Sequence, residues 1–94
     1  MATFILFGNY TQAGLKAARP ERTKKALKIL RDNDGTLTAA YAMLGETDLL
    51  LVTEFPTVEA AMGASLALNR EMGIAFRTAP AVPIELFDKL LPRA

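Results

Sequence analysis

The chain contains no cysteine and no histidine, and these two absences remove much of the commonest catalytic and metal-binding chemistry. Without cysteine there is no disulfide, no thiolate metal site and no cysteine nucleophile. Without histidine there is no imidazole to bind zinc or haem, to act as a general base near neutral pH or to complete a catalytic triad. The chain also has no glycine-rich phosphate loop. We therefore expect no metal site and no cofactor.

The chain also has little net charge and no long apolar run. The net charge is only +1, so the chain as a whole does not have the basic character of a nucleic-acid-binding domain. The apolar run at residues 4–7 is too short for a signal peptide or a membrane span, and no basic region precedes it. We expect a cytoplasmic protein with no membrane partner.

What the chain does have is apolar side chains. Hydrophobic residues make up 51% of its 94 positions, which is too many for a disordered chain. This length suits a single domain over residues 1–94. So high an apolar content in so small a domain indicates that part of it is covered by a partner.

The spacing of apolar, capping and breaking residues divides the chain into eight elements. Thr11 and Thr57 are expected N-caps, Gly73 is expected to close the second long helix, and Gly35 is expected in the left-handed conformation after the first. Pro80 weakens the last strand and places it at a sheet edge. The expected strands are 3–10, 36–44, 49–55 and 74–82, with a hairpin loop at 45–48; the expected helices are 12–18, 20–33, 58–72 and a short tail helix at 84–91.

This order predicts an α+β fold of ferredoxin-like βαββαβ type, with an antiparallel four-stranded sheet and helices on one face only. The helix-free face is expected to be apolar too, because the first strand has apolar residues on both faces. An open patch around Ile5, Phe7, Leu50 and Val52 would measure on the order of 500 Å². Covering it yields roughly 12 kcal/mol gross per subunit, and two such faces together exceed an association cost of about 4 to 15 kcal/mol. We therefore expect a homodimer with its sheets face to face; the pattern does not fix which face the helices cover.

Four segments recur in the order expected of GYD domain proteins: residues 4–11, 45–48, 52–56 and 77–78. The chain resembles this family over most of its length, to about Thr78. The resemblance implies a dimeric α/β barrel, in which two such sheets face one another, and implies no particular reaction. The loop Gly45-Glu46-Thr47-Asp48 has Thr47 where the family has tyrosine, and Ala79 and Pro80 replace a more polar continuation of the last strand.

Two charged residues of the expected strands are candidates for chemistry. Glu54 follows an apolar run, and a carboxylate in a buried strand must be paired, protonated or facing a cavity. It is a candidate catalytic general base; alternatively it lies in water at the strand end or pairs with Arg77. Arg77 in turn either binds an anionic group of a ligand or neutralises Glu54.

Three polar side chains are further candidates for ligand binding. Asn9 and Tyr10 end the first strand just before a helix, where they can face the mouth of a cavity, and the phenol of Tyr41 lies in the middle of a strand. The alternative for all three is packing with one hydrogen bond. Asp48 is expected to be structural, because aspartate in a turn bonds to nearby backbone.

Basic residues are concentrated near the N-terminus. Residues 1–34 have seven basic and three acidic side chains, a sum of +4, whereas residues 35–94 have four and seven, a sum of −3. The basic run is either a polyanion site or, as we expect, the solvated face of an amphipathic helix.

Three functions fit this reading. The first is binding of a small, partly apolar molecule between sheet and helices, with Asn9, Tyr10, Tyr41 and Arg77 as ligand-binding residues. The second is a cofactor-independent oxygenase or isomerase using Glu54 or a tyrosine as acid or base, a fold analogy only. The third, an RNA-binding module, is not expected, because the strand at 49–54 lacks the aromatic and basic residues that stack bases. Whether there is turnover, and whether dimers associate further, is left open.

Overall fold

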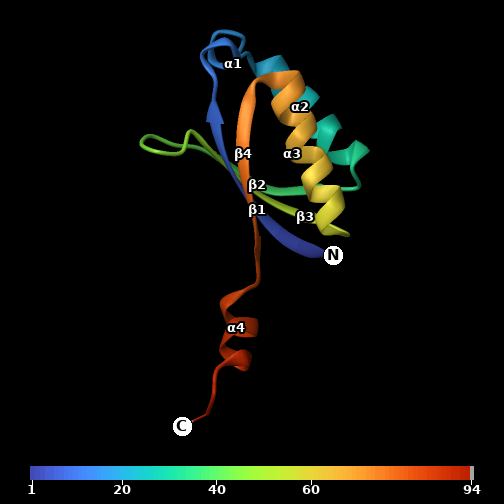
Figure 1. Ribbon diagram of the computed structural model, residues 1–94, viewed down its shortest axis with the longest axis vertical. Coiled ribbons are helices and arrows are strands. Elements are labelled where there is room, and N and C mark those ends of the chain that lie inside the picture. Colours follow the sequence, from blue (N-terminus) through green and yellow to red (C-terminus); the bar gives the residue numbers. More distant parts are fainter. Residues whose placement is uncertain (94) are drawn as a thin grey trace.

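The computed structural model describes residues 1–93. Every element expected from the sequence is present, in the expected order (Figure 1). The strands are β1 (Ala2–Tyr10), β2 (Thr36–Ala42), β3 (Leu49–Phe55) and β4 (Ile74–Ala81); the helices are α1 (Gln12–Lys16), α2 (Pro20–Asp32), α3 (Val58–Met72) and α4 (Ile84–Leu90). The second strand ends at Ala42, two residues earlier than expected, so Met43 and Leu44 belong to the hairpin loop.

The four strands form one antiparallel sheet in the order β2-β3-β1-β4. Helices α2 and α3 lie together on one side of this sheet, and the other side has no helix (Figure 1). This is the predicted ferredoxin-like arrangement. The last strand lies at an edge, which is where Pro80, lacking a backbone N–H, is tolerated.

The register of the central strands decides which side chains face the helices. On β1, Phe4 and Leu6 are buried beneath the helices, whereas Ile5 and Phe7 point to the helix-free face and are half-buried there. Ile5 is paired with Val52 and Phe7 with Leu50. All four apolar side chains predicted for the open patch therefore share one face. We call this surface the open face.

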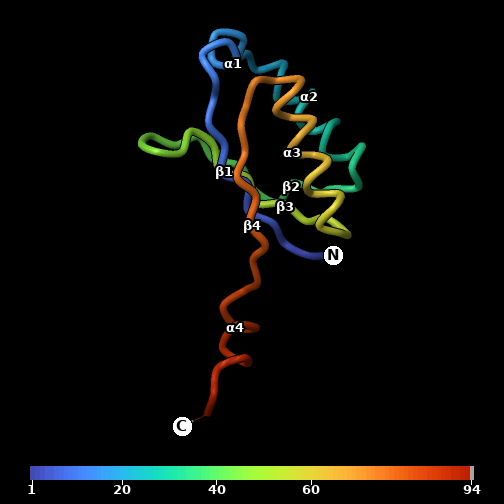
Figure 2. Tube along the Cα trace, viewed as in Figure 1, coloured from blue at the N-terminus to red at the C-terminus, as the bar shows by residue number. Residues whose placement is uncertain are grey.

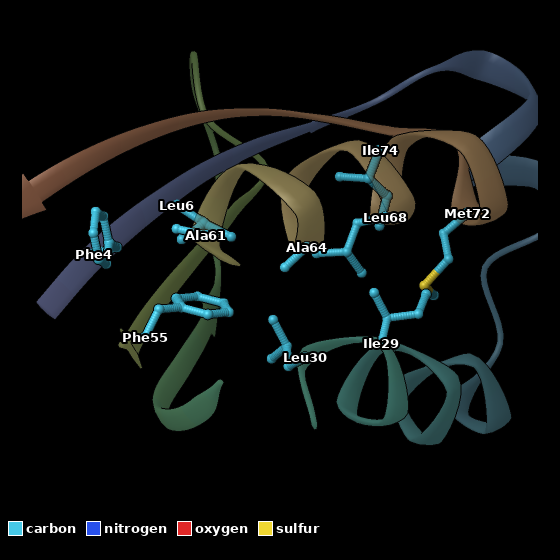
Figure 3. Packing of buried hydrophobic residues seen from close by; sticks show 10 residues of the cluster. All are labelled: Phe4, Leu6, Ile29, Leu30, Phe55, Ala61, Ala64, Leu68, Met72 and Ile74. Atoms are coloured by element: carbon cyan, nitrogen blue, oxygen red, sulfur yellow. The ribbon is translucent and has the colours of Figure 1, made fainter. Parts of the chain in front are cut away.

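The core fills the space between the sheet and the two long helices. Phe4 and Phe55 meet edge to face, with ring centroids 6.0 Å apart. Figure 3 shows the aliphatic side chains of α2, such as Leu30, pointing toward those of α3, such as Leu68. The one buried polar side chain of the described residues, Thr53, donates its hydroxyl to the Phe4 carbonyl at 2.8 Å, so burial leaves it satisfied.

The helix ends mostly follow the expected signals. The hydroxyls of Thr11 and Thr57 accept hydrogen bonds from the backbone N–H groups of Gly14 and Ala60, and Gly73 ends α3 with a φ of 66°. The expectation for Gly35 was wrong, because Asp34 takes the left-handed conformation after α2, with a φ of 61°. Gly35 is needed for a different reason: a Cβ there would overlap the ring of Phe55.

Helix α4 projects beyond the rest of the molecule. The Cα trace in Figure 2 continues from β4 past the end of the sheet and into α4, which contributes to a longest extent of 53 Å. None of its residues is buried. Among the described residues, no helix has the length and hydropathy needed to cross a membrane.

Candidate functional site

A cavity of about 160 Å³ lies between α2 and the sheet. Its walls come from α2, from the helix-facing side of all four strands and from the end of α3. The apolar lining residues are Ala18, Ala26, Leu27, Leu30, Leu37, Ala40, Leu49, Leu51, Leu68, Met72, Ile74 and Phe76; the polar ones are Tyr10, Arg19, Arg22 and Thr23. The cavity is therefore an apolar space with a few polar groups, as small-molecule sites usually are.

Small residues line the cavity from two elements. Helix α2 presents Ala26 and strand β2 presents Ala40, while the neighbouring wall positions are leucines. Interiors are otherwise packed as densely as organic crystals. Ala26 is half-buried, so a larger side chain there would occupy part of this space, whereas Ala40 is exposed.

Two arginines give the cavity its charge. Arg19 donates to the carbonyl oxygens of Lys16 and Ala18, at 3.1 and 2.8 Å, and Arg22 donates to the carbonyl oxygen of Glu71 at 3.3 Å. Neither guanidinium is in an ion pair, because the ion pairs within residues 1–93 are Lys25–Glu71 and Lys28–Asp32. Each arginine has more donors than these carbonyls use. Two residues of the cavity lining therefore have guanidinium donors that these carbonyls do not use.

Tyr10 connects this cavity to a second, shallower hollow of about 330 Å³ at the adjoining end of the sheet. The second hollow is lined by Tyr10, Thr11, Gln12, Leu15, Ala42, Met43, Asp48 and Leu49. Asp48 fixes the main chain at this point, since its Oδ2 accepts the backbone N–H of Tyr10 at 2.9 Å. Asp48 is thus structural, as expected, but it supports β1 rather than its own turn.

The hairpin loop between β2 and β3 is held against the open face. Asn9 donates its side-chain amide to the carbonyl oxygen of Glu46 at 2.6 Å, and Arg77 donates to the hydroxyl of Thr47 at 3.3 Å. The Arg77 guanidinium also lies over the Phe7 ring, 5.5 Å from its centroid, a cation–π contact. Asn9 and Arg77 therefore position the loop.

Of the residues singled out from the sequence, only Tyr10 lines the cavity between sheet and helices. The other candidates point to the opposite side of the sheet, the open face; they are Asn9, Tyr41, Glu54 and Arg77. Tyr41 is 59% exposed there. The sequence pattern did not separate these two groups, because both faces of the sheet are apolar.

The suggested pairing of Glu54 with Arg77 was wrong. Glu54 lies opposite Thr3, whereas Arg77 lies opposite Phe7, and β1 separates their strands. Four residues along the strand and two strand spacings place their Cα atoms about 16 Å apart. Glu54 is half-buried and is in no ion pair of the described residues.

Sequence reasoning missed the two arginines of the cavity. They were grouped with the solvated basic run, which is correct for the exposed side chains of Lys24, Lys28 and Arg31. Arg19 is exposed as well, whereas Arg22 is half-buried. A signal was present, since Arg22 stands four residues before Ala26, at a position that continues the apolar side of the helix. A cationic residue in line with an apolar stripe indicates a charged group at the edge of a core.

A comparison with protein families places this geometry in context. The family model for the GYD domain matches residues 4–91, nearly the whole chain. The chain belongs to the GYD domain family. A search of curated proteins finds none that matches significantly.

The loop that resembles the signature of the GYD domain is the hairpin loop described above. Gly45 has a φ of 111° there, and Asp48 and Thr47 make the contacts to Tyr10 and Arg77. The loop therefore joins both sides of the sheet: Asp48 supports the strand end that lines the cavity, and Thr47 contacts the open face. Thr47 provides a hydroxyl for Arg77 at the position where the resemblance led us to expect a tyrosine.

Proposed function

We propose that this GYD domain binds a small, partly apolar molecule in the cavity between α2 and the sheet. The observation that supports this most directly is the cavity itself, about 160 Å³ with mainly aliphatic walls. An engineered apolar cavity of about 150 Å³ in another protein accepts benzene. The space therefore suits one ring or a short branched chain.

The charges at the cavity favour an anionic group on the ligand. Arg19 and Arg22 line the cavity without a carboxylate partner among the described ion pairs. A guanidinium binds a carboxylate through two parallel hydrogen bonds, which are stronger than neutral ones. The phenol of Tyr10 adds a further donor or acceptor. The proposed ligand class is a small aromatic or branched aliphatic carboxylate.

Benzoate and its uncharged analogue benzamide test this proposal by isothermal titration calorimetry. We expect benzoate to bind with a Kd on the order of 1 mM, because this corresponds to about 0.5 kcal/mol for each non-hydrogen atom of benzoate, within the roughly 0.3 to 1.5 kcal/mol per atom that ligands reach. Benzamide should bind more weakly, and Arg22→Gln should remove most of the difference. Ala26→Leu, which fills the cavity, should abolish both. Benzoate binding that survives Ala26→Leu would place the ligand elsewhere.

We also propose that the domain works as a homodimer through its open face. Ile5, Phe7, Leu50 and Val52 form a continuous apolar surface on a side without helices. A second copy presents the same surface, so two-fold pairing covers both at once. Val52→Lys should convert the dimer to a monomer in analytical ultracentrifugation, whereas Lys28→Ala on α2 should not. A wild-type monomer at micromolar concentration would refute this assembly.

The other candidate functions have less support. Glu54 lies on the face opposite the cavity, so acid–base chemistry within the cavity would depend on Tyr10. On the open face β3 presents Leu50 and Val52, which stack no bases. Binding of oligonucleotides that weakens steeply with salt would revive the RNA alternative.

A further inference from the structure

Helix α4 is amphipathic but has nothing beneath its apolar side. It extends away from the sheet and from the other helices (Figures 1 and 2). At 100° per residue its apolar side chains gather on one side, opposite Glu85, Asp88 and Lys89. The apolar side chains are Ile84, Leu86, Phe87, Leu90 and Leu91, each 46% exposed or more.

A helix of this length requires packing to be stable. Isolated helices shorter than about 12 to 15 residues are marginal in water, and α4 has seven residues. The family match extends to residue 91 and so includes all of α4. The helix is thus part of the GYD domain, and its apolar side needs a surface to cover it.

Helix α3 has an apolar surface that matches α4 in length. Val58, Met62 and Leu66 are spaced four residues apart and are 54%, 56% and 58% exposed. They lie on the side of α3 away from α2, because α2 contacts the side that contains Glu71. We call these three residues the α3 stripe. It is about 12 Å long, and α4 is about 10.5 Å long.

The two surfaces do not meet within one chain. Only Val82 and Pro83 separate the end of β4 from α4, and Pro83 has an extended conformation, with φ −58° and ψ 150°. The chain therefore continues beyond the end of β4 (Figure 1) instead of reversing onto α3. A second copy of the chain presents an identical, uncovered α3 stripe.

We infer that α4 of one subunit packs against the α3 stripe of a second copy. The eight apolar side chains of the two surfaces have about 100 Å² of exposed area each, so one contact buries up to about 800 Å², and two-fold symmetry doubles this limit to about 1,600 Å². That limit is the size of a standard stable interface. The contact uses residues outside both the cavity and the open face, so it is independent of ligand binding.

Disulfide trapping tests the inference. The chain has no cysteine of its own, so the introduced cysteines are the only ones that can form a disulfide. Chains with Met62→Cys and chains with Leu90→Cys, distinguished by a tag, are co-expressed and then oxidised. We expect a mixed disulfide between the two chains as the main product. Glu71→Cys, on the opposite side of α3 where it faces α2, replaces Met62→Cys in the control pair, and its yield should be at least tenfold lower.

Three results would overturn the inference. One is an equal yield from the control pair, and another is no disulfide in either pair. The third is a double variant, Met62→Cys with Leu90→Cys in one chain, that forms an intrachain disulfide when co-expressed with excess wild-type chain, because α4 would then fold back on its own subunit. Far-ultraviolet circular dichroism and the mass of each reduced variant verify that the substitutions leave the fold and the assembly intact.

Discussion

Replacing Ala26 by leucine should raise the stability of the fold and abolish ligand binding in the cavity. The substitution therefore distinguishes a binding cavity from a space that is already packed. Ala26 lines the cavity from α2, where leucine is nearly as good a helix former as alanine. Leucine adds three carbon atoms, fewer than the six of the benzene ring that a cavity of this size accepts. The substitution should therefore fill empty space without displacing its neighbours.

The magnitude follows from the burial of those three carbons. At about 0.8 kcal/mol each they contribute roughly 2.4 kcal/mol, and fixing the side chain costs about 0.5 to 1 kcal/mol. The net gain in unfolding free energy is about 1.5 to 2 kcal/mol. For a domain of this size the midpoint of thermal unfolding should rise by about 6 to 16 °C.

Urea unfolding at a fixed protein concentration measures this gain, since association also affects apparent stability. Ala13→Leu on the exposed side of α1 is the matched control and should change stability by less than about 0.5 kcal/mol. Benzoate titration of the same two proteins should show binding lost in Ala26→Leu and kept in Ala13→Leu. A loss of 1 kcal/mol or more in Ala26→Leu would mean that the space beside Ala26 is already filled and cannot hold a ligand.

Three further substitutions give distinct outcomes. Gly35→Ala should lower the urea midpoint, by about 1 to 3 kcal/mol in unfolding free energy, because its Cβ overlaps the Phe55 ring; an unchanged midpoint would contradict the packing described. Thr11→Ala removes the cap on Gly14 and should cost about 1 kcal/mol in the same assay, and no loss would show that the cap contributes nothing. Glu54→Gln should leave the affinity for benzoate unchanged in calorimetry, since Glu54 lies on the open face. A tenfold loss of affinity would show that Glu54 contributes to the binding site.

The elements were predictable because their ends have local causes. Thr11 and Thr57 supply hydroxyls to free helix amides, and Gly73 tolerates a positive φ that other residues avoid. The position of Gly35 was predicted for the wrong reason. A glycine after a helix usually takes the left-handed conformation, but here Asp34 does so, and Gly35 gives room to Phe55, a residue 20 positions later in the sequence. Contacts of that range have no local signature.

The placement of the candidate site residues depended on register, which the sequence did not define. Strand β1 is apolar at every position from 4 to 7, so alternation could not assign a side chain to one face. A pairing of Glu54 with Arg77 was one alternative offered on chemistry alone, and the strand between them sets the two residues apart. The cavity was the least predictable feature, because its lining residues come from α2, α3 and all four strands.

Methyl-resolved NMR of the protein titrated with benzoate tests for a ligand site between α2 and the sheet. We predict shift changes and ligand contacts concentrated on the methyl groups of Leu27, Leu51 and Met72, which line the cavity. The methyl groups of Ile5 and Val52 on the open face should remain unaffected. Changes confined to Ile5 and Val52, or no changes at millimolar benzoate, would contradict this prediction.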